Sequence, residues 1–113
     1  MSDNQLNEIP GAVTLCDPQG IIVDMNSAAE KFFEKDGGRS LIGTNMLDCH
    51  PEPARTKVAA LLANRSTNVY TIEKRGVRRL IYQAPWYVDG EYRGLIEIQL
   101  EVPEHIPHFI RKG

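Results

Sequence analysis

The chain has 113 residues, of which 42% are hydrophobic and 25% are charged, and its formal net charge is −2. This length suffices for one domain with its own core, and the composition lies near the globular average, which excludes a disordered or low-complexity chain. The weak negative charge gives no long-range attraction to phosphate groups. We therefore expect neither nucleic acid nor an anionic membrane surface as a direct partner.

Cysteine content and the N-terminal segment indicate the compartment. Cys16 and Cys49 are too few for a disulfide framework and match no zinc motif, which favours a reducing cytoplasm. Residues 1–8 lack the basic flank and apolar run of a signal peptide, and no apolar stretch approaches the length of a membrane span. We expect a cytoplasmic protein without membrane insertion, in which residues 1–8 form a flexible leader.

The first elements of the domain are predicted to be a β-hairpin and a short helix. A proline-glycine turn at residues 17–20 separates a strand at 12–16 from an alternating strand at 21–25. Ser27 as N-cap and Glu30 three residues later form a capping box, which predicts a short helix ahead of two phenylalanines.

The middle of the chain is predicted to be helical. Residues 39–48 carry apolar side chains but are interrupted by Gly43 and Asn45, which indicates one or two single-turn helices. Prolines at positions 51 and 53 suit a helix start, and apolar residues spaced i, i+4, i+7 and i+8 from Ala54 predict one amphipathic helix to about Asn64.

Three strands are expected to close the domain, at residues 67–74, 77–88 and 92–102, with glycine-containing turns between them. The predicted fold class is α+β: a five-stranded antiparallel sheet with short helices and one longer helix packed on one face. Because alternation and the helical stripe point to one shared interior, the predicted core is Val13, Leu15, Phe32, Phe33, Val58, Leu61, Leu62, Ile96, Ile98 and Leu100.

Several short stretches, in their order and spacing, resemble the PAS family of sensory domains. They are Ile9-Pro10-Gly11-Ala12-Val13, Asp17-Pro18-Gln19-Gly20, Asn26 with Ser27-Ala28-Ala29-Glu30, Ile42-Gly43 and Asp89-Gly90. The resemblance covers residues 9–102 and leaves 103–113 as a C-terminal extension. It implies a sheet cupped around short helices that holds a small ligand or cofactor, or that acts as a dimerisation and relay unit.

A finer resemblance concerns the run Cys49-His50-Pro51, together with Trp86-Tyr87. It is similar to a PAS subgroup found beside hemerythrin-like domains in bacteria and archaea. Flavin-binding members of the family carry a cysteine that forms the photoadduct, and Met46 stands at that position here. Met cannot form a thiol adduct, so flavin photochemistry is disfavoured.

Heme stays an alternative, with His50 as the iron ligand, although His50 precedes the long helix instead of lying within it. The simpler interpretation is that the imidazole braces the helix entry through a bond to the backbone or to Asp48. A third hypothesis is that His50 holds the polar end of a small, partly apolar metabolite, for which the free amides at the helix start would favour an acidic group. His105 and His108 have metal-like spacing, but Pro107 between them and the lack of a third ligand nearby argue against a metal site.

The expected function is therefore a ligand-binding sensory module in signal transduction, with output through a homodimer or an effector protein. A ligand-free dimerisation or docking module is the alternative, and no combination of acid, base and nucleophile predicts an enzyme. The predicted ligand-binding residues are His50, Cys49, Met46, Tyr82, Trp86 and Asn26.

Overall fold

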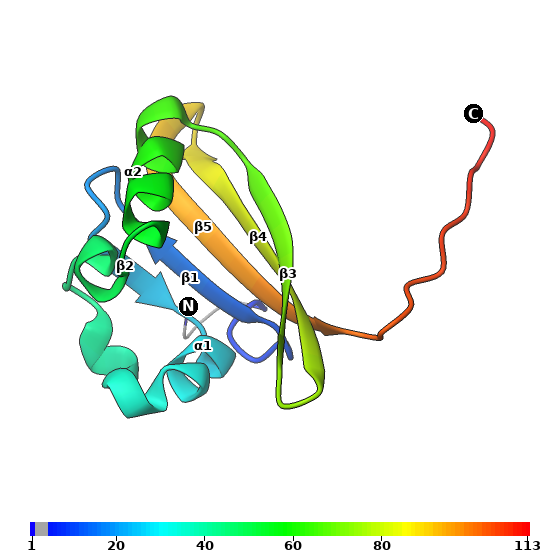
Figure 1. Ribbon diagram of the computed structural model, residues 1–113. Helices are drawn as coiled ribbons and strands as arrows, with labels where there is room; N and C mark the ends of the chain where they lie inside the picture. Colours follow the sequence, from blue (N-terminus) through cyan, green and yellow to red (C-terminus); the bar gives the residue numbers. More distant parts are fainter. Residues whose placement is uncertain (2–4) are drawn as a thin grey trace.

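The computed structural model describes residue 1 and residues 5–113, apart from the side chain of Cys49. Its centre is an antiparallel sheet in the order β2-β1-β5-β4-β3 (Figure 1). The strands are β1 (Ala12–Cys16), β2 (Ile22–Met25), β3 (Asn68–Lys74), β4 (Val77–Val88) and β5 (Glu91–Val102). The predicted five-stranded sheet is confirmed, with strand ends within one residue of those expected.

The helical elements lie between β2 and β3 in the chain and cover one face of the sheet (Figure 1). They are α1 (Ser27–Phe32), η1 (Glu34–Asp36), η2 (Gly38–Leu41), η3 (Met46–Cys49) and α2 (Ala54–Asn64). The predicted single-turn helices and the one longer helix are confirmed. None of the described helices has both the length and the apolar character needed to cross a membrane.

The two tight turns of the β3-β4-β5 meander set its register. Arg75 and Gly76 have φ of 54° and 78°, and Asp89 and Gly90 have φ of 51° and 80°. Two successive positive φ values are the type I′ geometry whose twist matches that of the flanking strands. The two hairpins therefore set the pairing of β3, β4 and β5, which is regular apart from a register shift between Trp86 and Tyr87. In this pairing Gln83 lies opposite both Asn68 and Glu97.

The segment between η2 and η3 runs along the free edge of β2. Gly43 N donates to Ile22 O over 2.8 Å, and Ile22 N donates to Thr44 O over 2.9 Å. Met46 N then donates to Gly20 O over 2.8 Å. These bonds cover the edge strand and fix η3 beside the sheet, so that the turn before α2 is anchored to the sheet.

The sheet turns a mixed face, not its most apolar face, toward the helices. In the β1–β5 ladder, Cys16 pairs with Leu95 and Thr14 with Glu97, and these residues point toward the helices. The intervening residues Ile96, Ile98 and Leu100 therefore point outward. The expectation that they build the core is wrong, because the polar side chains of β5 face inward.

Burial of the predicted core follows from this orientation. Val13, Val58, Leu61 and Leu62 are buried as expected, whereas Leu15, Phe33, Ile96 and Ile98 are only half-buried. Phe32 is 41% and Leu100 is 40% exposed, which contradicts their assignment to the core. The buried cluster instead contains Ala12, Cys16, Ile22, Met25, Ala29, Met46, Val58, Leu61, Leu62 and Leu95.

Candidate ligand-binding cavity

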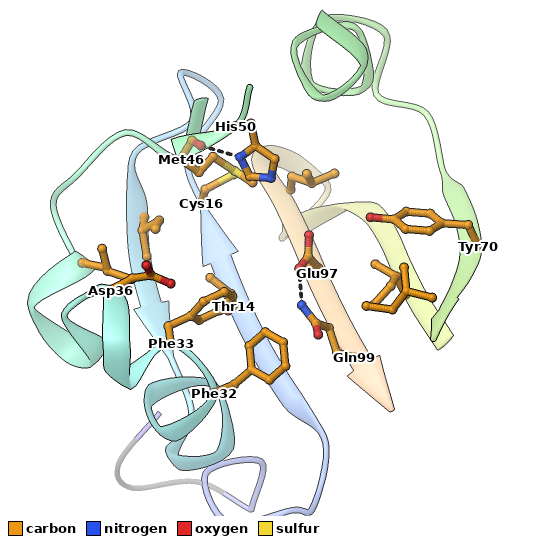
Figure 2. Close-up of a pocket in the computed structure, with 15 residues that line it drawn as sticks. Thr14, Cys16, Phe32, Phe33, Asp36, Met46, His50, Tyr70, Glu97 and Gln99 are labelled. Carbon is orange, nitrogen blue, oxygen red and sulfur yellow. Dashed lines mark hydrogen bonds between the residues drawn. The ribbon is translucent and has the colours of Figure 1, made fainter. Parts of the chain in front are cut away.

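A cavity of about 470 Å³ lies between the inner face of the sheet and the helical segment (Figure 2). Strands β1, β3, β4 and β5 form its floor, and residues from α1 to His50 form its other walls. The lining residues are Thr14, Cys16, Ile22, Phe32, Phe33, Asp36, Leu41, Met46, His50, Tyr70, Ile72, Ile81, Leu95, Glu97 and Gln99. Its volume is in the range of small-molecule sites.

A row of amide groups converges on one carboxylate across the inner face. Asn68 Nδ2 donates to Gln83 Oε1 over 3.0 Å, and Gln83 Nε2 donates to Glu97 Oε2 over 2.9 Å. From the other side, Gln99 Nε2 donates to Glu97 Oε1 over 2.8 Å (Figure 2). We call these four residues the polar row. Because an ionised carboxylate only accepts hydrogen bonds, Glu97 fixes the orientation of both glutamine amides.

The polar row leaves acceptor capacity unused. Gln99 Oε1 is buried and accepts no hydrogen bond from the part of the chain that the structure describes. Each oxygen of Glu97 accepts one amide hydrogen, whereas a carboxylate has about four lone-pair sites in all. The unpaired Gln99 Oε1 is costly because it is buried, whereas the free lone pairs of the half-buried Glu97 can accept from a donor in the cavity that it lines. The floor of the cavity is thus suited to a group that donates hydrogen bonds.

His50 reaches the cavity from the turn between η3 and α2. Its Nδ1 lies 2.6 Å from Met46 O, and since a carbonyl oxygen can only accept, Nδ1 carries the proton of this bond. In the neutral ring Nε2 is then an acceptor. Figure 2 shows the imidazole, the Tyr70 hydroxyl and Glu97 all pointing into the cavity. His50 is braced by the backbone, as the simpler interpretation holds, and it also lines the cavity.

Two ionisable groups in the cavity have raised pKa values. Burial raises the pKa of the Cys16 thiol to about 11, with added repulsion from Asp17 and Glu97. Burial, with repulsion from Glu97, also raises the pKa of the Tyr70 hydroxyl. Both groups therefore stay protonated at neutral pH, so Cys16 contributes an unreactive wall and Tyr70 a hydrogen-bond donor.

The mouth of the cavity is aromatic. The Phe32 and Phe33 rings form an edge-to-face pair with centroids 5.0 Å apart. The Arg79 guanidinium lies 5.0 Å from the Phe32 centroid, and its Nη2 is 3.4 Å from Glu101 Oε1. Arg79 thus links α1 to the sheet next to the cavity. This contact explains why Phe32, predicted to be in the core, lies at the rim instead.

A second cleft of about 390 Å³ adjoins the first, beneath α2. His50 and Tyr70 line both hollows, and Gln83 and Asn68 of the polar row line the second one. Lys57 of α2 also lines this cleft and is exposed. The two hollows therefore share the region between His50 and the polar row.

Of the predicted site residues, His50 and Met46 line the cavity. The side chain of Cys49 lies outside the described residues. Tyr82 is on the outer face of the sheet, paired with Ile98 and 41% exposed, and it does not reach the cavity. An alternation of apolar side chains shows which residues share a face, but it does not show which face is inside.

Trp86 and Asn26, also predicted to bind the ligand, make hydrogen bonds within the fold instead. Trp86 pairs with Gly94, and its Nε1 reaches across β5 to donate to Cys16 O over 3.0 Å. Asn26 is fully buried: its Oδ1 accepts from Val13 N and Ala29 N, and its Nδ2 donates to Leu6 O and Gly11 O. Asn26, not the predicted Ser27, is therefore the N-cap of α1.

The start of α2 does not offer the free amides expected for an acidic ligand. Glu52 Oε1 accepts from Thr56 N over 2.8 Å, and Arg55 N and Lys57 N donate to the carbonyls of Pro51 and Pro53. The chain's own carboxylate thus occupies the position that an anion would take. The hypothesis of an acidic metabolite held at this helix start is not supported.

Sequence reasoning missed the polar row, Tyr70 and Thr14. A signal was nonetheless present: Thr14, Gln83 and Glu97 are the polar members of three different alternating strands, and all three fall on one face once the strands are paired. Polar residues gathered on a helix-covered face indicate a cavity more readily than a core.

This geometry agrees with the comparisons to known proteins. A family model described as the PAS fold matches residues 6–104. The chain belongs to the PAS family. No curated protein shows significant sequence similarity to this PAS domain.

Solved structures share the fold at low sequence identity. A C-terminal domain from Streptococcus mutans has a TM-score of 0.66 at 23% identity, covering 85% of this chain and 78% of that one. A sensory box sensor histidine kinase from Vibrio cholerae has a TM-score of 0.59 at 19% identity, covering 87% and 86%. The Aer2 receptor from Vibrio cholerae, described as a dual PAS-heme oxygen sensor, has a TM-score of 0.59 at 18% identity, covering 82% and 95%.

Proposed function

We propose that this PAS domain is a sensory module of signal transduction that binds a small organic molecule in the cavity above the polar row. The observation that carries the proposal is the convergence of Gln83 and Gln99 on Glu97, whose side chain lines a hollow of about 470 Å³. The sensor kinase and oxygen-sensor structures that share the fold support the sensory role.

Packing alone does not account for the polar row. Burying polar groups costs free energy unless each is hydrogen-bonded, and apolar side chains of similar volume would pack this face at lower cost. Gln83 is 3% exposed and still carries an amide, which donates to the Glu97 carboxylate at the cavity floor. A domain used only for docking would gain stability from an apolar floor, which favours the ligand-binding function over the ligand-free docking module.

Heme is the second candidate, favoured by the bond from His50 Nδ1 to Met46 O. Histidines that bind iron commonly donate their other N–H to a backbone carbonyl, and this bond leaves Nε2 of His50 to the cavity. The remainder of the site fits heme less well, because the floor carries the acceptors of Glu97 and Gln99 where a macrocycle needs apolar surface.

We further propose that output passes through the outer face of the sheet, to a second copy or an effector protein. Val69, Tyr82 and Leu100 are each at least 40% exposed there. Residues 103–113 lead away from the sheet in Figure 1 and carry exposed apolar side chains at Ile106, Phe109 and Ile110. A ligand that contacts Glu97 on β5 acts on the same strand that presents Ile98 and Leu100 outward, so repacking inside can alter the outer face.

Native mass spectrometry of the purified protein tests the ligand-binding function, with Thr14→Phe and Thr71→Phe as matched variants. Thr14 faces the cavity, whereas Thr71 is exposed on the other face of β3. We expect a retained molecule on wild type and on Thr71→Phe, and its loss from Thr14→Phe, whose ligand-free melting temperature is equal or higher. A Soret absorption band would identify heme. Equal retention by both variants would place the binding site elsewhere.

A further inference from the structure

The charges of the cavity are of one sign. Among the fifteen described residues that line it, two are carboxylates, Glu97 and Asp36, and none is a lysine or an arginine. Arg79 lies at the rim, but its guanidinium pairs with Glu101 and rests on Phe32. Lys57 lines the second cleft and not this cavity. An anionic ligand would therefore meet a carboxylate, with the titratable His50 as the one lining residue among those described that can carry a positive charge.

Hydrogen-bond acceptors of the cavity lie at Glu97 and His50, and the Tyr70 hydroxyl supplies a donor. Gln83 Nε2 and Gln99 Nε2 each direct one of their two N–H groups at Glu97, and each carboxylate oxygen keeps a second lone pair as an acceptor. His50 adds Nε2 as an acceptor in the neutral ring, because its Nδ1 donates to Met46 O. A ligand group that supplies several N–H donors satisfies these atoms together.

The amides also position the carboxylate. One amide holds each oxygen of Glu97, from Gln83 on the neighbouring strand and from Gln99 two residues along β5. A carboxylate fixed at both oxygens loses little conformational freedom when a ligand binds, which raises affinity and directional selectivity. Burial is the main cause of the raised pKa values of Cys16 and Tyr70, and repulsion from Glu97 adds to both.

We infer that the cavity recognises a small organic cation, with an ammonium, amidinium or similar N–H-rich group at Glu97. Its apolar body lies against the hydrophobic part of the wall, formed by Phe33, Leu41, Ile81 and Leu95. This inference rests on the proposed ligand-binding function and replaces the acidic ligand suggested by the sequence. The attraction between the ligand cation and Glu97 is strengthened by burial, because salt screens a half-buried carboxylate less than one at the surface.

Three probes of one shape and different charge test the inference by NMR titration of the full chain: 2-phenylethylamine, 2-phenylethanol and 3-phenylpropanoate. The side-chain amide signals of Gln83 and Gln99 report directly on the site. We expect 2-phenylethylamine to shift these signals, and to bind at least tenfold more tightly than the alcohol or the carboxylate.

Two charge-removing variants on β5 complete the experiment. Glu97→Gln keeps the shape and should remove the preference for the amine, whereas Glu101→Gln loses the same charge outside the cavity and should keep it. Equal or tighter binding of the alcohol or the carboxylate, or an unchanged preference in Glu97→Gln, would overturn the inference and leave ligand binding standing. If none of the three probes shifts any cavity signal, the inference is also overturned, and the mass spectrometry of the Thr14→Phe and Thr71→Phe variants decides the ligand-binding function separately.

Discussion

Gln83 stands directly opposite Glu97 in the β4–β5 ladder, and its side-chain Nε2 donates to Glu97 Oε2 over 2.9 Å. The pair lies on the face that the helices cover, where Glu97 lines the cavity and Gln83 lines the second cleft. A directly opposed pair is the closest cross-strand contact that an antiparallel sheet provides. The strand register therefore builds the polar row, and each residue of the row is held by backbone pairing as well as by its own hydrogen bonds.

Asn26→Ala should cost stability and not ligand recognition, although Asn26 was predicted to bind the ligand. The substitution removes four hydrogen bonds and leaves buried groups such as Val13 N and Gly11 O without partners. We expect a loss of about 3 kcal/mol or more in urea unfolding, since each buried unsatisfied group costs about 1–3 kcal/mol. Asn64→Ala, at the exposed end of α2, is the control and should change little. A loss of unfolding free energy close to that of the control would show that the hydrogen bonds of Asn26 do not stabilise the fold.

Gly94→Ala should be far more harmful than Gly76→Ala. Both glycines have positive φ, at 130° and 78°, but a Cβ at Gly94 would overlap Cys16 O whereas one at Gly76 meets no atom within 4 Å. The carbonyl of Cys16 cannot move freely because it accepts from Trp86 Nε1. We expect the unfolding free energy, measured by chemical denaturation, to fall by about 1–2 kcal/mol in Gly76→Ala and by at least about 3 kcal/mol in Gly94→Ala. Equal losses would mean that β1 and β5 are less closely packed than described.

The variant His50→Ala distinguishes a role of His50 in bracing the entry to α2 from a role in binding the ligand. The bond between Nδ1 and Met46 O spans a single turn, so its loss should lower the unfolding free energy of the ligand-free protein by about 1 kcal/mol. Affinity for 2-phenylethylamine should fall by more than tenfold, because the ring lines the cavity. His105→Ala, in the exposed C-terminal segment, is the control. A large loss of stability with unchanged affinity would assign His50 to bracing alone.

The buried thiol of Cys16 should make the folded protein less stable at alkaline pH. Burial raises the pKa of its thiol from 9.0 to about 11, so the unfolded chain loses this proton first. The contribution of the protonated thiol is complete below pH 9 and disappears as pH rises to about 11, on the order of 2–3 kcal/mol. Unfolding curves of wild type and Cys16→Ala should therefore converge between these pH values. A constant difference from pH 8 to pH 11 would show that the thiol is not desolvated.

The fold was predictable because its signals are local. Turns such as Asp89-Gly90 have one favoured geometry, and the apolar spacing from Ala54 to Leu62 fits only a helix. PAS membership followed from the order of such short stretches.

The candidate site was less predictable because it depends on which face of the sheet is covered. The alternation in β5 shows that Glu97 and Ile98 lie on opposite faces of the sheet, but it does not show which face the helices cover. The sequence-based prediction placed the apolar residues of β5 on the covered face. His50 and Met46 were found because they lie beside the helix entry. Tyr70 and the polar row are brought together only by strand pairing over distances of about 13–30 residues in the chain.

The unfolding free energy of the ligand-free triple variant Gln83→Met, Glu97→Met and Gln99→Met tests the central claim most directly. If the polar row exists for recognition, apolar side chains of similar length should leave stability unchanged or raise it by about 1–4 kcal/mol, because they remove buried polar groups from the floor. A fall of more than about 2 kcal/mol would contradict the account, since the row would then be a structural element of the fold and the cavity above it a by-product of packing.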